Sequence, residues 1–175
     1  TLVRHRSEVV KNGGIIYDPA YEATRIQDIP TLEKEFVDES VAELKEKGFR
    51  GTVADLVEDA KRDGVRIYPL PYMDLLKGVA EKLGEPKLSK LTRMINILSL
   101  GASCAILDFD IELLAKAISY MFGAKPRVAD MNILASRMAY DYAKKSYGTG
   151  FGVRLERAEA REKRIFLMGN QAVAL

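Results

Sequence analysis

The glycine-rich run "GTGFGV", Gly148 to Val153, is where residue types and spacing could most directly do chemistry. Closely spaced glycines bring backbone N–H groups to a dinucleotide pyrophosphate when they join a strand to a helix. The third glycine of that pattern would stand at position 153, which is valine. The run also follows a predicted helix instead of a strand. We therefore interpret it as linker glycine and predict no phosphate site there.

The single cysteine and the single histidine are the candidates for nucleophilic or metal chemistry. Cys104 lies in the small apolar run "LGASCAIL", which is typical of a buried packing residue. His5 stands between Arg4 and Arg6, where a solvated or locally hydrogen-bonded imidazole is expected. One thiol excludes an internal disulfide, and it cannot hold an iron–sulfur cluster or structural zinc by itself. The sequence thus predicts no metal site within this chain alone.

Carboxylates are abundant, but none forms a pair that stands out from ordinary surface charge. Asp108 and Asp110 flank Phe109 just before a predicted helix, so their expected role is capping and a favourable interaction with the helix dipole. The P-loop, HExxH and GxSxG motifs are absent. Spacing alone therefore assigns no catalytic residue and leaves the cofactor-binding residues unknown.

The composition is that of a globular protein with a real core. The 175 residues are 47% hydrophobic and 30% charged, and the net charge of +2 is small, with both signs interspersed. A nucleic-acid site would need basic residues gathered on one face, and no apolar run is long enough to cross a bilayer. We therefore expect no nucleic-acid partner and no membrane. We also find no signal peptide, so we expect a cytoplasmic location. Few Asn and Gln beside many Lys, Arg and Glu hint at a thermophile.

The elements that would position any site alternate between strand and helix, which predicts an α/β fold with a sheet covered by helices. A short strand, Ile15 to Tyr17, follows the stop at Asn12 to Gly14, and "VRIYPLP" at 65–71 predicts a second strand. Between them, residues 25–64 form a charged pair of predicted helices. Their simplest role is an amphipathic cover on the sheet, and a partner-contacting insertion is the alternative.

Helical patterns dominate the rest of the chain. Predicted helices cover 72–84, 87–107, 110–123 and 128–146, and small residues around Gly101 would let another backbone approach closely. The apolar stripes that we assign to the core run through Leu88, Leu91, Ile95, Leu98, Ala102 and Ile106, through Ile111, Leu114, Ala115, Ile118 and Phe122, and through Met131, Leu134, Met138 and Tyr142.

The last segment, "RIFLMGNQAVAL", raises the question of why a new apolar element begins so close to the end. A charged linker is predicted at 144–164 and a strand at the start of 165–175. An unpaired apolar strand invites association, so we expect it to pair with a sheet edge or another chain.

The order of four segments supplies an identification that single motifs do not. "NGGIIYD", "YPLPYMDLLKGVAEKLG", "TRMINILSLGASCAILDFDIELLAKAI" and "NILASRMAYDYA" together resemble the latter part of the gamma domain of 2-oxoacid:ferredoxin oxidoreductases. "GNQAVAL" resembles the "GNEA" opening of the pyrimidine-binding domain in the alpha subunit, with Gln171 where Glu is more usual.

The resemblance implies a domain organisation. Residues 1–143 would be a gamma-type domain whose glycine-rich start lies before Thr1, with 25–64 as a charged helical insertion. Residues 165–175 would be the first strand of a truncated pyrimidine-binding domain, whose Tyr-Pro-x-Thr-Pro signature would follow later.

The resemblance also implies an activity, namely oxidative decarboxylation of a 2-oxoacid to an acyl-CoA with reduction of ferredoxin. It implies thiamine diphosphate, Mg²⁺, an iron–sulfur cluster and coenzyme A for the whole enzyme, with none held by this chain alone. The expected partners are the rest of the alpha subunit, a beta subunit and ferredoxin. The chain would serve mainly assembly, without a complete active site.

Two other functions stay open. A stand-alone α/β domain could bind a nucleotide or metabolite at its strand ends. A non-catalytic assembly subunit could use the charged 25–64 segment as its contact surface, and deletion of that segment would then abolish partner binding while leaving the fold.

Overall fold

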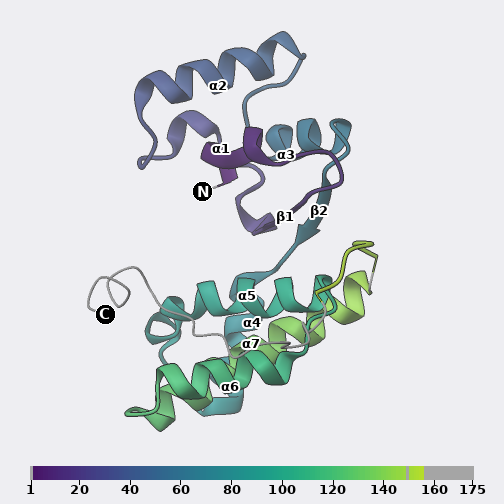
Figure 1. Cartoon of the computed structure of the whole chain (residues 1–175). Coiled ribbons are helices and arrows are strands. Elements are labelled where there is room, and N and C mark those ends of the chain that lie inside the picture. Colours follow the sequence, from purple (N-terminus) through teal and green to yellow (C-terminus); the bar gives the residue numbers. More distant parts are fainter. Residues whose placement is uncertain (1, 149, 156–175) are drawn as a thin grey trace, which may run out of the picture.

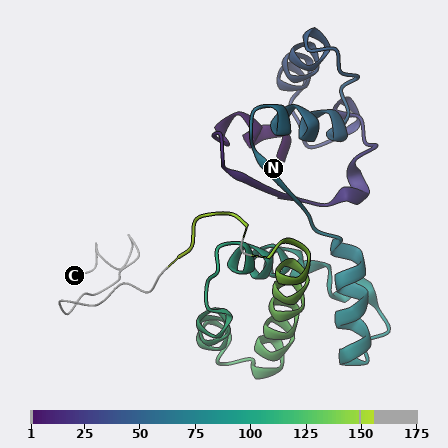
Figure 2. The same ribbon diagram turned by 90° about the vertical axis from the view of Figure 1, so that its right-hand side faces the viewer.

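The computed structural model describes residues 2–148 and 150–155 and shows two lobes joined where a strand leads into a helix (Figures 1 and 2). The first lobe holds α1 to β2, and the second holds α4 to α7. Short 3-10 helices are labelled η. The elements are α1 (Leu2–His5), η1 (Arg6–Glu8), β1 (Gly14–Tyr17), η2 (Pro19–Tyr21), η3 (Ile26–Asp28), α2 (Lys34–Glu46), α3 (Val53–Arg62), β2 (Arg66–Pro69), α4 (Tyr72–Leu83), η4 (Leu88–Lys90), η5 (Thr92–Met94), α5 (Ile95–Ile106), α6 (Ile111–Met121) and α7 (Pro126–Tyr147).

A two-stranded parallel sheet confirms the predicted α/β class, although helices dominate the described residues. β1 and β2 pair in parallel, with Ile15 opposite Ile67 and Ile16 opposite Tyr68. Because side chains alternate along a strand, Ile15 and Ile67 join one apolar cluster, whereas Ile16 packs against the core of the helical lobe. The two faces of this small sheet therefore belong to different cores.

The charged segment 25–64 contributes directly to the sheet. Val57 and Ala60 of α3 are buried against Ile15 and Tyr17, so α3 is the helix that covers one face between the parallel strands. A capping box between Thr52 and Asp55, the third residue of the helix, starts α3. Deleting 25–64 would thus remove part of the sheet's core. It would also remove the cluster in which Val37 and Leu44 of α2 pack with Val3. That the segment is an insertion relative to the family stays a prediction.

The helical lobe is built around a close contact between α5 and α7. A Cβ placed on Gly101 would lie 2.1 Å from the carbonyl oxygen of Ser136, so the two backbones touch. This confirms the prediction that small residues here admit another helix. The residues of α7 that are buried are correspondingly small: Ala129, Asn132, Ala135, Ser136, Ala139 and Ala143.

The apolar stripe predicted for α7 is wrong in detail, because Met131, Leu134, Met138 and Tyr142 are only partly buried. These larger side chains lie at the margins of the contact, and alanines occupy its centre. A wide side chain at the centre would separate the two backbones, so the close approach selects the small residues.

The predicted helix at 87–107 is also shorter than expected, because α5 begins at Ile95 and two 3-10 turns precede it. Leu88, Leu91 and Met94 recur every three residues, which matches the 3-10 repeat and directs all three inward. Ile95, which the helical stripe assigned to the core, is 36% exposed.

The residues after α7 return to the sheet. Phe151 packs edge-on against Tyr68 with ring centroids 6.2 Å apart, and the Arg66 guanidinium lies 5.2 Å from the Phe151 ring centroid. The backbone N–H of Leu155 donates to the carbonyl of Leu107 at 2.9 Å. The first four residues of the linker predicted at 144–164 are therefore helical, and Phe151 and Leu155 are packed. Residues 156–164 and the strand predicted in 165–175 lie outside the described residues.

Candidate functional site

The described residues form a cleft of about 280 Å³ between α1, η1, α2 and α3. Its floor is apolar and includes Val3, Leu44 and Leu56. Its walls carry charge and hydroxyl groups, supplied by Arg6, Ser7, Glu39, Ser40, Glu43, Lys47, Asp59 and Asp63. Four carboxylates against two cations make the cleft acidic.

A partly buried ion cluster lies at one side of this cleft. The Arg6 guanidinium donates to Asp63 and lies 3.7 Å from the Asp59 carboxylate, and Lys47 Nζ donates to both Asp59 oxygens at 2.8 and 2.9 Å. The side chains of Arg6 and Asp59 are 11% and 10% exposed. The cluster ties η1 to α3 and to the end of α2, so its first role is structural.

The cluster is poorly suited to acid–base catalysis, because each carboxylate at its centre already accepts from a cation. Arg6 Nε is buried without a hydrogen-bond partner within the described part of the chain. Simple sequence patterns missed the cluster, since Arg6 and Asp63 are 57 residues apart. The only available signal was the i, i+4 spacing of Asp59 and Asp63 on a helix that otherwise shows an apolar face.

A second groove, of about 230 Å³, lies at the carboxyl end of β1, where open parallel sheets commonly bind ligands. Tyr17 donates to the Glu22 carboxylate, and the Asp18 carboxylate accepts from the N–H of Ala20 at 3.0 Å. Burial and, secondarily, the bond to Glu22 raise the pKa of Tyr17 well above its usual value, so its phenol stays neutral. The groove is otherwise mostly apolar, with Tyr21 at its rim.

At the carboxyl end of β2, Tyr147 joins the two lobes by donating to the carbonyl of Pro69. Its ring lies edge-on to Tyr68, with centroids 5.2 Å apart. Burial and the neighbouring Tyr142 raise the pKa of Tyr147 to about 12. The phenol is therefore a permanent donor in the folded state at neutral pH.

This raised pKa predicts a specific alkaline instability. Above the usual phenol pKa of 10.0, Tyr147 ionises in the unfolded chain but stays protonated in the folded one until about pH 12. The unfolded state then binds fewer protons, so the free energy of unfolding falls as pH rises through this window. Tyr147→Phe should reduce that fall, while costing about 1 kcal/mol at pH 8 for the lost hydrogen bond.

Urea unfolding at pH 8 and pH 11, followed by circular dichroism, measures both effects. Tyr120→Phe is the matched control for loss of a phenol hydroxyl, because Tyr120 is 90% exposed. Some alkaline loss will remain in Tyr147→Phe, since Tyr17 also keeps its proton in the folded state. Equal pH dependence in wild type and Tyr147→Phe would contradict the assignment.

The structure also places the other residues that the sequence singled out. Cys104 is buried, and burial raises the pKa of its thiol, which confirms a packing role. His5 is exposed, with Nδ1 2.8 Å from the Glu8 carboxylate, so its predicted local hydrogen bond is confirmed. Gly148 ends α7 with φ 59°.

The two aspartates before α6 have different roles. Asp110 caps the helix by accepting from the N–H of Glu112 at 2.9 Å, as predicted. The capping role predicted for Asp108 is wrong. The chain turns through a positive φ of 53° at Asp108, and its carboxylate pairs with Lys144 of α7 at 2.5 Å instead. Lys144 lowers the pKa of Asp108, which keeps the pair charged.

The described residues offer neither a cluster of metal ligands nor a membrane-spanning helix. No group of three or more His, Cys, Asp or Glu side chains within 2–148 and 150–155 is arranged to hold a metal ion. In the same residues, no helix combines the length and the apolarity that crossing a bilayer requires.

Comparison with known proteins is consistent across the chain. The profile of the family described as pyruvate ferredoxin/flavodoxin oxidoreductase matches residues 1–142. The alpha subunit of 2-oxoacid:ferredoxin oxidoreductase 2 from Aeropyrum pernix is 31% identical over 148 residues, which are 85% of this chain and 23% of that protein. The alpha subunit from Saccharolobus solfataricus is 30% identical over 100% of this chain and 26% of its own length. The alpha subunit of enzyme 1 from Sulfurisphaera tokodaii is 30% identical over 92% of this chain and 24% of its own length. The chain thus spans about a quarter of the length of these relatives.

Proposed function

The chain belongs to the pyruvate ferredoxin/flavodoxin oxidoreductase family, and from this premise we propose that it is part of the alpha subunit of a 2-oxoacid:ferredoxin oxidoreductase. The whole enzyme would oxidatively decarboxylate a 2-oxoacid, transfer the acyl group to coenzyme A and pass the electrons to ferredoxin. The contribution of this chain would be to fold and support the assembly, with the chemistry performed elsewhere in the enzyme.

The observation that carries the proposal is the match to alpha subunits along the length of the chain, up to 100% of it. Because the chain covers about a quarter of those relatives, the activity of the whole protein need not lie within it. The chemistry of its own side chains agrees. The Arg6–Asp59–Asp63 cluster is paired internally, and its ion pairs hold the first lobe together.

The residues of this chain do not fit an iron–sulfur cluster. Such clusters need several thiolates, whereas the sequence has one cysteine, which is buried with a raised pKa. We therefore derive no electron-transfer step through these residues. Thiamine diphosphate, Mg²⁺, the cluster and coenzyme A would be held by the remaining alpha subunit and a beta subunit in a cytoplasmic complex.

Reconstitution tests this function. The tagged full chain is mixed with the remaining polypeptides of the enzyme, and coenzyme A-dependent ferredoxin reduction is measured with pyruvate and with 2-oxoglutarate. We expect the full chain to co-purify with the other polypeptides, activity only when all of them are present, and none from the chain alone. A mixture lacking only this chain is the control. Turnover by the isolated chain, or full activity without it, would contradict the proposal.

A further inference from the structure

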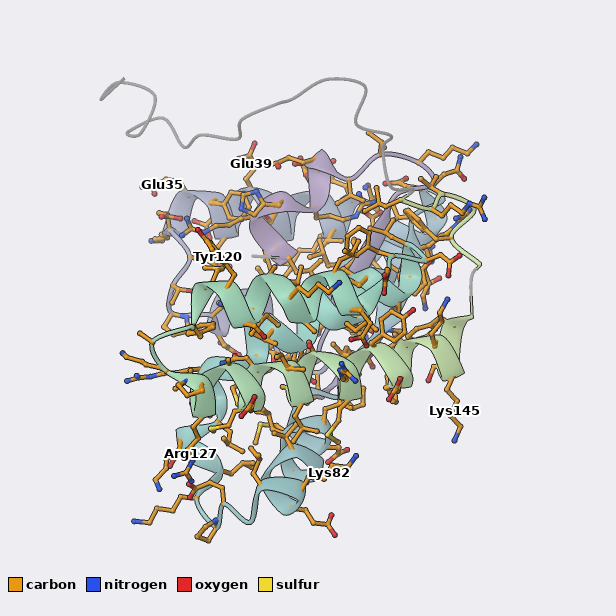
Figure 3. All side chains as sticks on the ribbon, turned by 60° about the horizontal axis from the view of Figure 1, so that its bottom comes forward. Glu35, Glu39, Lys82, Tyr120, Arg127 and Lys145 are labelled. Carbon is orange, nitrogen blue, oxygen red and sulfur yellow. The ribbon has the colours of Figure 1, made fainter. Side chains whose placement is uncertain are left out.

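The end of α6 and the start of α7 carry an exposed apolar surface, which we call the α6 tip. Tyr120 is 90% exposed and Met121 is 78% exposed, next to each other in the chain. Figure 3 shows Tyr120 and Arg127 near the same end of the α6–α7 pair, with Lys145 at the far end of α7. The α6 tip comprises Ala117, Tyr120, Met121, Ala124 and Val128, all of them exposed.

The core of the helical lobe does not need this surface. Leu114, Ala115 and Ile118 form the buried face of α6, and Leu114 and Ile118 pack in one cluster with Cys104. The outward face of such a helix ordinarily carries polar residues, since water solvates it. Large adjacent apolar side chains at this position therefore indicate a surface that another molecule covers.

The backbone holds the tip in a defined shape. The N–H of Phe122 donates to the carbonyl of Ile118 at 3.0 Å, and the N–H of Lys125 donates to the carbonyl of Phe122 at 2.6 Å. The Phe122 side chain packs against the cluster of Leu114 and Ile118, which fixes the turn from inside. Tyr120 and Met121 are thus presented from an ordered turn, so a partner need not order that backbone when it binds.

Basic residues flank the tip along the chain. Lys116 stands one helical turn before Tyr120, and Lys125 and Arg127 open α7, all with exposed side chains. Among the described residues, Arg127 has Glu85 as an electrostatic neighbour, whereas Lys116 and Lys125 form no ion pair. The exposed carboxylate nearest in sequence is Asp130, one turn into α7. The rim is therefore net positive and complements carboxylates on a partner.

We propose that the α6 tip docks into an apolar pocket edged by carboxylates on another polypeptide of the same enzyme, with Tyr120 and Met121 as its anchors. This proposal rests on the proposed function, because it takes the partner from the assembly. Tyrosine and methionine are enriched at the centres of protein interfaces, where a few anchors supply most of the affinity. A bilayer fits less well, because membrane adhesion uses clusters of about four to eight Lys or Arg residues, more than this rim offers.

The test titrates the immobilised full chain with the remaining polypeptides of the enzyme. Tyr120→Ser combined with Met121→Ser should raise the Kd at least about 30-fold, as expected when central anchors are truncated. The matched control is Val10→Ser, whose side chain is 73% exposed in the other lobe and should leave the Kd unchanged. Lys116→Glu combined with Lys125→Glu should slow association at low salt and lose this effect at high salt.

The outcomes separate the two proposals. Both serine variants should unfold at the wild-type urea concentration, because the altered side chains are exposed, so a change in Kd reports on the interface. If wild type binds and the tip variant binds equally well, the docking proposal is overturned and the proposed function stands. If wild type binds none of the enzyme's polypeptides, the proposed function fails and the docking proposal fails with it. Tip-dependent adhesion to phosphatidylserine vesicles without polypeptide binding would overturn a protein as occupant.

Discussion

Gly101→Ala is expected to lower the free energy of unfolding by about 3 kcal/mol, the upper end of the usual range for overpacking. The added Cβ would lie 2.1 Å from the carbonyl oxygen of Ser136 and 2.8 Å from its carbonyl carbon. These are backbone atoms, which cannot rotate away, so α5 and α7 must separate. Separation would open the most extensive helix contact of the lobe and loosen the alanines at its centre. The loss would outweigh the gain of about 1 kcal/mol in helix propensity.

Gly78→Ala is the matched control for this substitution. Gly78 is also inside a helix, α4, and a Cβ there would lie 2.7 Å from the terminal methyl of Met138. That methyl ends a flexible side chain, so it can move at little cost. We expect the stability of Gly78→Ala to stay within about 1 kcal/mol of wild type. Urea unfolding followed by circular dichroism compares the two variants, and equal stability would mean that the two backbones are not in contact.

The second large effect is expected at the partly buried ion cluster. Asp59→Ala should lower the free energy of unfolding by about 3 kcal/mol, because it leaves Lys47 without its partner and Arg6 with one carboxylate in place of two. Asp63 alone then compensates the 11%-exposed Arg6 side chain. The loss reflects a buried guanidinium left with one carboxylate in place of two and a half-exposed ammonium left without its partner. It therefore does not measure what the ion pairs contribute relative to an apolar cluster.

Two further variants serve as controls for the prediction at Asp59. Glu33→Ala breaks the pair with Arg4, in which the Arg4 and Glu33 side chains are 41% and 63% exposed, and should cost much less stability than Asp59→Ala. Arg6→Met combined with Asp59→Leu removes both buried charges and should recover stability relative to Asp59→Ala. Chemical unfolding at low and high salt measures all three. A loss at Asp59 no larger than that at Glu33 would show that the cluster is effectively solvated.

Besides the chain connection from β2 to α4, contacts of Tyr147 with Pro69 and Tyr68 join the two lobes. We therefore expect these contacts to contribute to stability. β2 leads directly into α4, and Tyr147 returns from the end of α7 to bond Pro69 at the end of β2. Phe151 then packs on Tyr68 from the same side of the sheet. An effect of the Tyr147 substitution on stability would therefore report on the joint between the lobes as well as on one hydrogen bond.

Helix caps and short strands, which depend on residues within about one helical turn, could be predicted from the amino-acid sequence. The capping box at Thr52 and the cap at Asp110 formed as their order predicts, because a cap joins a side chain to an N–H two or three residues away. The apolar run from Ile15 to Tyr17 likewise formed the predicted strand, β1. The order of longer segments also identified the family before any geometry was known.

Contacts between residues that are far apart in the sequence could be seen only in the folded structure. Asp108 pairs with Lys144 instead of capping α6, and Arg6 meets Asp59 and Asp63 across the first lobe. Tyr120 stays exposed, whereas Ile118 and Phe122 pack inward. An apolar side chain needs apolar neighbours and a charged one needs water or an opposite charge, but many positions along a chain can supply such neighbours. The path of the backbone decides which of these sites a side chain meets. The contact between Gly101 and Ser136, for example, sets the distance between α5 and α7.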